Sequence, residues 1–194
     1  MKKKIVIFNG SPRSDGNTIT LLNLIAKGAR DAGAEVEFYI LFKMKFMACQ
    51  GCFGCRAQSA CVIKDELSDA LQKVIEADAI VVGSPIFHMQ MTGPVKNLYA
   101  RLFPLADIAF EPHIAYKPRF APKKLVTVYS QGDPDPATYE SYFEYTAGTL
   151  FPAFGLDLVD NIVCTRAWDP AAVEGDAALK IRAYEAGKAL ALGK

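Results

Sequence analysis

The sequence has no long hydrophobic run, and this absence excludes a membrane-spanning helix. No apolar stretch approaches the roughly 18 residues that such a helix needs. After the three lysines at 2–4 only four apolar residues precede Asn9, whereas the apolar region of a secretory signal needs about 7–15. We therefore expect a cytoplasmic protein with no membrane partner.

An excess of charge of one sign is also missing. Lys and Arg total 22 against 21 Asp and Glu, a net charge of +1. This balance gives neither the basic stripe of a nucleic-acid-binding protein nor an acidic tail. The sequence also lacks repeats and low-complexity tracts. It has no Ser-His-Asp order, no H-E-x-x-H motif and no paired carboxylates, so hydrolytic chemistry has no support. The length of 194 residues suits one domain, 1–194, that needs no disulfides.

What the sequence does contain is a regular alternation of strand-like and helix-like segments. Short apolar or alternating runs predict strands at 5–8, 36–42, 79–82, 125–129 and 156–165. Helical periodicity predicts helices at 17–32, 67–75, 94–102 and 136–150, and a last helix that starts at Asp169-Pro170. Five such units predict an α/β fold: a doubly wound, five-stranded parallel sheet in the flavodoxin-like order 2-1-3-4-5.

The predicted topology places the functional loops at one edge of the sheet. Ligands bind such sheets at the carboxyl ends of the strands, where strands one and three diverge. The loops that leave this edge are 9–18, 44–64 and 83–93. We therefore expect all three loops to open on the same edge. The Pro- and aromatic-rich stretch 104–122 is expected to be a long connection.

The first loop reads Gly-Ser-Pro-Arg-Ser-Asp-Gly-Asn-Thr from position 10 to 18. It is neither a Walker A loop, because Asn17 replaces the lysine, nor a G-x-G-x-x-G fingerprint. A helix N-terminus offers free N–H groups to an anion, and Ser11, Ser14, Thr18 and Arg13 add further donors. A phosphomonoester is the expected ligand, and a polar helix cap is the simpler interpretation.

Four of the five cysteines, Cys49, Cys52, Cys55 and Cys61, fall within thirteen residues. In a chain without an export signal, such a cluster indicates metal binding or redox chemistry. An iron–sulfur cluster, a zinc ion and a dithiol without metal all remain open. Cys164 stands alone in a predicted strand and is expected to be a small buried apolar residue.

The first loop resembles the phosphate loop G-S-P-R-x-x-G-N-T of the NAD(P)H-dependent FMN reductases, a branch of the flavodoxin-like proteins. The similarity continues through 84–93, where that family holds the flavin ring, and through 157–169. Phe87, His88 and Met89 depart from the family's usual Tyr, aromatic and Gly at these positions. The resemblance implies the following FMN-binding residues: Ser11, Arg13, Ser14, Gly16, Asn17, Thr18, Pro85, Ile86, Phe87, His88, Gln90 and Met91.

The cysteine spacing is similar to the compact motif of the iron–sulfur flavoproteins of the same family. This resemblance implies a [4Fe–4S] cluster on Cys49, Cys52, Cys55 and Cys61. It also implies an FMN oxidoreductase that couples two-electron to one-electron chemistry, with NAD(P)H or ferredoxin as electron partner, and a homodimer or homotetramer. The alternatives are a cluster-free NAD(P)H-dependent FMN or quinone reductase, and a flavodoxin-like electron carrier. A carrier is expected to be strongly acidic, which a net charge of +1 does not match.

Overall fold

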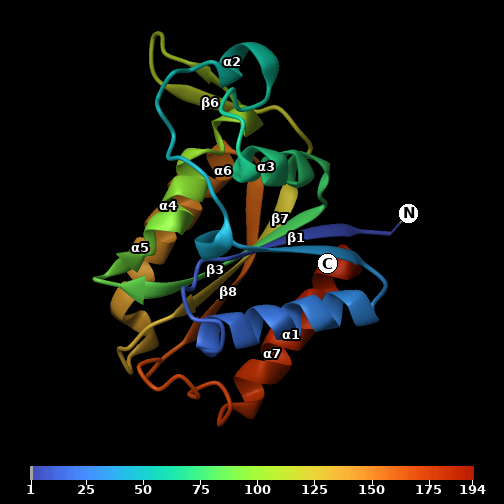
Figure 1. Ribbon diagram of the computed structural model, residues 1–194, viewed down its shortest axis with the longest axis vertical. Helices are drawn as coiled ribbons and strands as arrows, with labels where there is room; N and C mark the ends of the chain where they lie inside the picture. The colour runs from blue at the N-terminus through green and yellow to red at the C-terminus, as the bar shows by residue number, and fades with distance from the viewer. Residues whose placement is uncertain (1) are drawn as a thin grey trace.

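The computed structural model describes residues 2–194 and has a parallel sheet between two layers of helices (Figure 1). The sheet consists of five parallel strands in the order β2-β1-β3-β7-β8. They are β1 (Lys4–Asn9), β2 (Glu35–Ile40), β3 (Ala79–Phe87), β7 (Lys123–Ser130) and β8 (Leu156–Cys164). This is the predicted flavodoxin-like order, which is therefore confirmed. Strands β1, β3 and β7 are apolar and almost fully buried because helices cover both of their faces.

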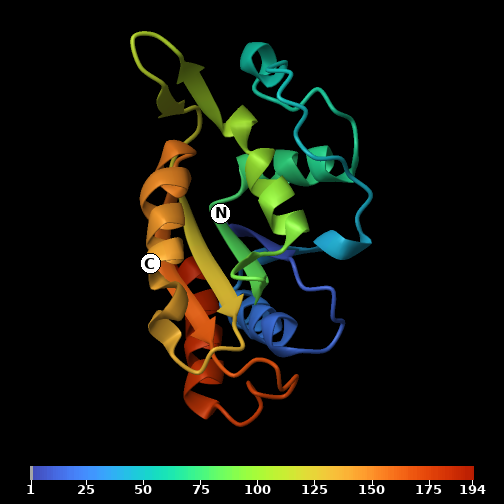
Figure 2. The same ribbon diagram turned by 90° about the vertical axis from the view of Figure 1, so that its left-hand side faces the viewer.

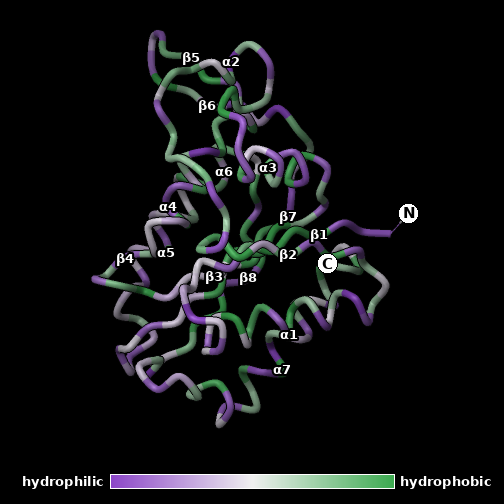
Figure 3. Tube along the Cα trace, viewed as in Figure 1, coloured by the Kyte–Doolittle hydropathy of each residue, from purple (hydrophilic) through white to green (hydrophobic). Residues whose placement is uncertain are grey.

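Two helices cover one face of the sheet, and four others cover the opposite face. Helices α1 (Asn17–Asp31) and α7 (Ala177–Ala191) pack together below the sheet in Figure 1. Helices α3 (Glu66–Glu76), α4 (Gly93–Ala100), α5 (Glu140–Tyr145) and α6 (Phe151–Ala153) form the other layer (Figure 2). Each layer has its own apolar cluster against the sheet. Figure 3 shows the strands as the most hydrophobic part of the trace.

Two hairpins lie outside the parallel sheet. The short strand β4 (Gln90–Met91) pairs with the end of β3 in antiparallel orientation. Within the expected connection 104–122, strands β5 (Ala106–Ala109) and β6 (Ala115–Pro118) form a separate antiparallel pair. This pair and the short helix α2 (Cys55–Gln58) lie at the top of Figure 1.

The last helix begins later than predicted. Asp169 does not cap it; its Oδ1 accepts a hydrogen bond from Ala171 N within a turn. Helix α7 starts at Ala177 instead, after Asp176, whose Oδ1 accepts a hydrogen bond from Leu179 N. The intervening backbone is not helical because its N–H and C=O groups bond to the side chain of Asn17 on α1.

The helix predicted over 136–150 is interrupted. It consists of η3 (Pro136–Tyr139), α5, the π-helical η4 (Thr146–Leu150) and α6. Pro152 has no N–H to donate to the carbonyl of Gly148, and Thr146 Oγ1 donates to the carbonyl of Tyr142 at 2.8 Å. Both features disturb regular α-helical bonding, which explains the break. Two 3₁₀ turns, η1 (Leu41–Lys43) and η2 (Phe103–Leu105), complete the fold.

In residues 2–194, no helix combines the length and the apolarity that crossing a membrane requires.

Candidate functional site

The loop after β1 is fixed to the neighbouring strand and helix by hydrogen bonds. Gly10 N donates to the carbonyl of Gly83 on β3 at 2.7 Å. The carbonyl of Gly10 accepts from Thr92 Oγ1, at the start of α4, at 2.9 Å. Ser11 N donates to Asn9 Oδ1 at 2.9 Å. These bonds hold the loop so that it leads directly into α1, whose first N–H groups have no partner within the helix. An anion can bind there.

A cavity of about 200 Å³ lies beside this helix N-terminus. The carboxyl ends of β3 and β7, the start of α1 and the loops after β1, β7 and β8 form it. Its lining residues are Ser11, Arg13, Gly16, Asn17, Thr18, Pro85, Ile86, Phe87, Ser130, Gly132, Ala167 and Trp168. The cavity therefore combines hydroxyl groups and a guanidinium near the helix N-terminus with apolar and aromatic side chains. This combination suits a ligand with a phosphate at one end and an apolar ring at the other.

The structure does not bring all of the expected cofactor-binding residues to this cavity. Ser14 is exposed and does not line it. His88 and Gln90 are exposed on the β3–β4 hairpin and do not line it either. Met91 is buried and lines a different cavity, of about 460 Å³, between α4 and η4.

Asn17 and Thr18 line the cavity, but their side chains are engaged with the protein. Asn17 Nδ2 donates to the carbonyl of Asp169 at 2.7 Å, and its Oδ1 accepts from Val173 N at 2.9 Å. Thr18 Oγ1 lies 2.5 Å from Ser130 Oγ. These two side chains therefore position the loops, and their backbone N–H groups are the ones that can face an anion.

Ser130, Gly132, Ala167 and Trp168 were not expected from the sequence. Ser130 ends the fourth parallel strand, and the other three lie in the loops after the fourth and fifth, so the predicted topology placed them at this edge without identifying them. Trp168, the only tryptophan, is 68% exposed and lies against Gly132. A Cβ added at Gly132 would lie 2.9 Å from its Cε3, so only glycine leaves room for the indole there.

The turn between β3 and β4 has a strained backbone. His88 and Met89 have φ values of 49° and 65°, as the two central residues of a two-residue hairpin turn of type I′ require. Glycine and asparagine adopt this conformation more easily than histidine and methionine. Strain of this kind is concentrated at functional sites, and here it lies directly beyond the cavity-lining Phe87.

The four clustered cysteines line a second, smaller cavity of about 60 Å³. Its other lining residues are Gly51, Phe53, Val62, Ala100, Arg101, Phe103 and Pro104. Burial raises the pKa of the Cys55 thiol, and negative charge on Cys61, Cys49 and Cys52 raises it further. The chain folds closely around the cavity, because a Cβ on Gly54 would lie 2.6 Å from Val62 Cγ1. Within residues 2–194, no three His, Cys, Asp or Glu side chains converge as a single metal ion would require.

Cys164 lies apart from these cysteines. It is 2% exposed on β8, in the apolar cluster beneath α1 and α7. Burial raises the pKa of its thiol to about 11. This placement agrees with the expectation of a small buried apolar residue.

The cysteine cavity is not at the same edge of the sheet as the phosphate-type cavity, contrary to our expectation. The loop 44–64 starts after β2 at that edge, but it carries the cysteines to the C-terminal end of α4, against residues 100–104. The loop after β1 meets α4 at its N-terminal end, through Thr92. Helix α4 has eight residues and spans about 12 Å. The two cavities share no lining residue.

Solved structures with the same fold include several flavin-linked proteins. An NAD(P)H:quinone oxidoreductase from Methanothermobacter marburgensis matches with a TM-score of 0.73 at 16% identity, over 98% of both chains. A flavone reductase matches with a TM-score of 0.69 at 22% identity, over 98% of this chain and 62% of its own. At these identities the likeness establishes the fold alone.

Sequence comparison adds relatives of higher identity. An iron–sulfur flavoprotein of Archaeoglobus fulgidus is 40% identical over 98 residues, which are 50% of this chain and 48% of that protein. An iron–sulfur flavoprotein of Methanocaldococcus jannaschii is 34% identical over 102 residues, 53% of each chain. The match thus spans about half the length of these curated relatives. The family model for NADPH-dependent FMN reductase matches residues 3–132, which include the loop after β1, the four clustered cysteines and the β3–β4 hairpin. The chain belongs to the NADPH-dependent FMN reductase family.

Proposed function

We propose that this chain is an FMN-dependent oxidoreductase that binds FMN in the 200 Å³ cavity and a [4Fe–4S] cluster on Cys49, Cys52, Cys55 and Cys61. The observation that carries the first part is the convergence of two strand ends and three loops on the N-terminus of α1. When bound, FMN supplies hydride and single-electron chemistry, and a cluster supplies single-electron chemistry. The protein supplies binding, orientation and shielding from water.

The residues of the FMN cavity have separable tasks in this proposal. The N–H groups at the start of α1, Ser11 and the Arg13 guanidinium would bind the phosphate. Phe87 and Trp168 would cover the apolar part of the ligand. Asn17 would hold the loop that carries Trp168, because it bonds to the carbonyl of the neighbouring Asp169.

The cluster rests on different support. Four thiols line one cavity whose other polar side chain is Arg101, and two relatives at 34% and 40% identity are named iron–sulfur flavoproteins. Four thiolates are the usual ligand set of a [4Fe–4S] cluster. A single zinc ion would accept the same four thiolates, but zinc sites usually draw their ligands from two separated pairs, whereas these four lie in one run of thirteen residues. Nicotinamide or ferredoxin as electron partner, and a homodimer or homotetramer, belong to the same proposal.

The FMN site can be tested with Trp168 as the reporter, because it is the only tryptophan and lines the cavity. FMN added to flavin-free protein should quench its fluorescence. Arg13→Gln should weaken FMN binding about tenfold, the effect of losing one charge-assisted hydrogen bond. Riboflavin, which lacks the phosphate, should bind both proteins equally. Arg30→Gln, at the other end of α1, is the matched control and should leave FMN affinity unchanged. No quenching and no flavin uptake would refute the FMN site.

The cluster needs a separate test. Anaerobic reconstitution with ferrous iron and sulfide should load both elements, and Ser at any one of the four cysteines should reduce the uptake. Cys164→Ser should leave the uptake unchanged, since Cys164 lies in the apolar cluster beneath α1 and α7, apart from the four cysteines. Stoichiometric zinc without sulfide would favour a zinc site, and four freely reactive thiols would favour a dithiol without metal. Oxidation of NAD(P)H by the loaded protein would separate a reductase from an electron carrier.

A further inference from the structure

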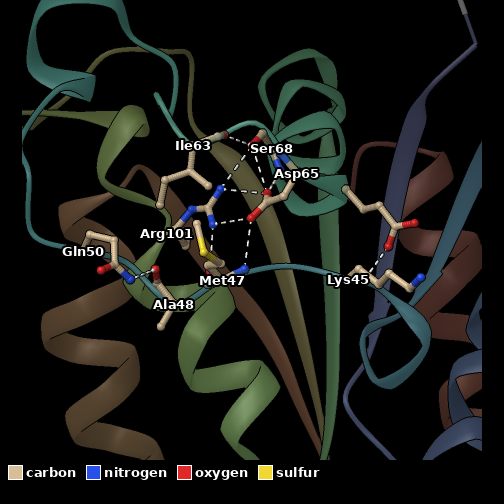
Figure 4. Close-up of polar contacts among 9 residues, drawn as sticks. Lys45, Met47, Ala48, Gln50, Ile63, Asp65, Ser68 and Arg101 are labelled. Carbon is tan, nitrogen blue, oxygen red and sulfur yellow. Dashed lines mark hydrogen bonds and ion pairs between the residues drawn. The ribbon is translucent and has the colours of Figure 1, made fainter.

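Arg101 joins the two ends of the cysteine loop. It follows α4 directly, and its guanidinium donates from Nη1 to the carbonyl of Met47 at 2.8 Å (Figure 4). It also forms a two-pronged ion pair with Asp65, with Nη1–Oδ2 and Nη2–Oδ1 distances of 3.0 Å. Met47 precedes the first cysteine of the loop and Asp65 follows the last, so these bonds close the loop at its base.

Arg119 holds the middle of the same loop from the side of β6. Its Nη1 donates to the carbonyl of Cys55 at 2.9 Å, and its Nη2 to the carbonyl of Arg56 at 2.8 Å. Its Nε donates to Asp107 Oδ1 at 2.7 Å. All three nitrogens of this guanidinium therefore have protein acceptors.

The two arginines differ at Nε. The side chain of Arg101 is 1% exposed, and its Nε is buried without a hydrogen-bond partner in residues 2–194. A buried, charged donor without a partner is costly, so a fold retains one where an acceptor comes from elsewhere. Arg101 also lines the cavity that the four cysteines line. Burial alone would lower the pKa of its guanidinium, but Asp65 and the neighbouring Cys61 raise it.

We infer that Arg101 is a positioning residue for the cysteine site, which closes the loop through Met47 and Asp65 and directs its free Nε–H and its positive charge at the cysteine sulfurs. This inference rests on the proposal that the cysteines hold an iron–sulfur cluster. Hydrogen bonds to sulfur and nearby positive charge stabilise the reduced, more negative form of a cluster, so Arg101 raises its reduction potential. A purely structural role would affect only how well the loop is held.

The test compares the midpoint potential of the cluster in protein reconstituted with ferrous iron and sulfide, and the iron content of each variant. Arg101→Gln should decrease the equilibrium constant for reduction about tenfold, which corresponds to about 59 mV for a one-electron couple. Arg119→Gln is the matched control: it loses a charge and loop contacts of the same kind but no donor in the cavity, so its potential should shift clearly less than that of Arg101→Gln.

Asp65→Asn separates charge from structure. Asparagine is also a good helix N-cap, so α3 should still form, but the charge of Arg101 is no longer balanced. The potential should therefore shift in the opposite direction from that of Arg101→Gln. Arg101→Lys keeps the charge and should recover most of the potential, which also covers the case in which Arg101→Gln does not fold.

The possible failures are distinguishable. Shifts of the same sign in Arg101→Gln and Asp65→Asn, or equal shifts in Arg101→Gln and Arg119→Gln, would overturn this inference and leave the cluster proposal intact. Wild-type protein that takes up no iron and sulfide would overturn both.

Discussion

At the scale of the residue, Asp65 connects a helix cap with a buried ion pair. Its Oδ1 accepts from Ser68 N at 2.9 Å in the capping box of α3, and both carboxylate oxygens bond to Arg101. Burial alone would raise the pKa of this carboxyl. The hydrogen bonds from Arg101, Met47 N and Ser68 outweigh burial and hold the pKa well below its ordinary value of 3.8.

This shift predicts how stability depends on pH. The folded pKa lies below the unfolded one, so the stabilisation by Asp65 is complete above pH 3.8 and is lost as the pH falls below 3.8 towards the folded value. In Asp65→Asn, the free energy of unfolding should be lower at pH 7 and should decline less as the pH falls from 5 to 3, a range that covers the onset of this loss. Asp157→Asn, at an exposed position on β8, should keep the wild-type pH profile. Urea unfolding of wild type and the two variants across this pH range measures the free energies of unfolding. Parallel profiles for Asp65→Asn and wild type would contradict the assignment of this pH dependence to Asp65.

At the scale of the element, α1 and α7 cross with their backbones in direct contact. A Cβ on Gly28 would lie 2.0 Å from the carbonyl oxygen of Tyr184, and one on Gly187 would lie 2.0 Å from that of Ile25. The helices can approach this closely only because both positions lack a side chain. Since α1 carries the loop of the proposed FMN cavity at its N-terminus, this crossing also sets the position of that loop.

Gly28→Ala should therefore destabilise the protein by about 1–3 kcal/mol, the usual cost of overpacking, although alanine favours helix formation. Gly148→Ala is the control in another helix, because a Cβ there meets nothing within 4 Å. It should be neutral or stabilising by up to about 1 kcal/mol. Chemical denaturation compares the free energies of unfolding of the two variants. FMN affinity should fall only in Gly28→Ala. A stable Gly28→Ala variant would mean that the helices can separate at no cost.

The elements also show what the sequence could and could not predict. The apolar runs at 5–8 and 79–82 predicted buried strands correctly because their pattern is local. The strands β5 and β6 were missed because they are short, and β6 is exposed along its whole length. The displaced start of α7 and the path of the cysteine loop depend on Asn17, Arg101 and Arg119, whose partners are distant in sequence. No periodicity reveals such bonds.

At the scale of the whole molecule, the proposed FMN cavity lies beside the loop that meets the N-terminal end of α4, whereas the cysteine cavity lies at its C-terminal end, and the two share no lining residue. Changes at sites more than about 7–10 Å apart without shared partners usually have additive effects. Cys61→Ser should therefore leave FMN affinity unchanged, and Arg13→Gln should leave iron uptake unchanged. In the double variant, FMN affinity should equal that of Arg13→Gln alone within about 0.5 kcal/mol, and iron uptake should equal that of Cys61→Ser alone, as measured by flavin titration and iron analysis. A larger coupling would show that α4 transmits changes between the sites.

The two arginines that hold the cysteine loop have a consequence for how a cofactor would be gained and lost. In a zinc finger, the metal orders the chain, so its removal unfolds the domain. Here the loop is already ordered by Arg101 at its base and Arg119 at its middle, so little conformational entropy is left to lose when iron and sulfide assemble. Oxidative loss of a cluster would then leave the cysteine loop folded, and the same folded chain could bind iron and sulfide again.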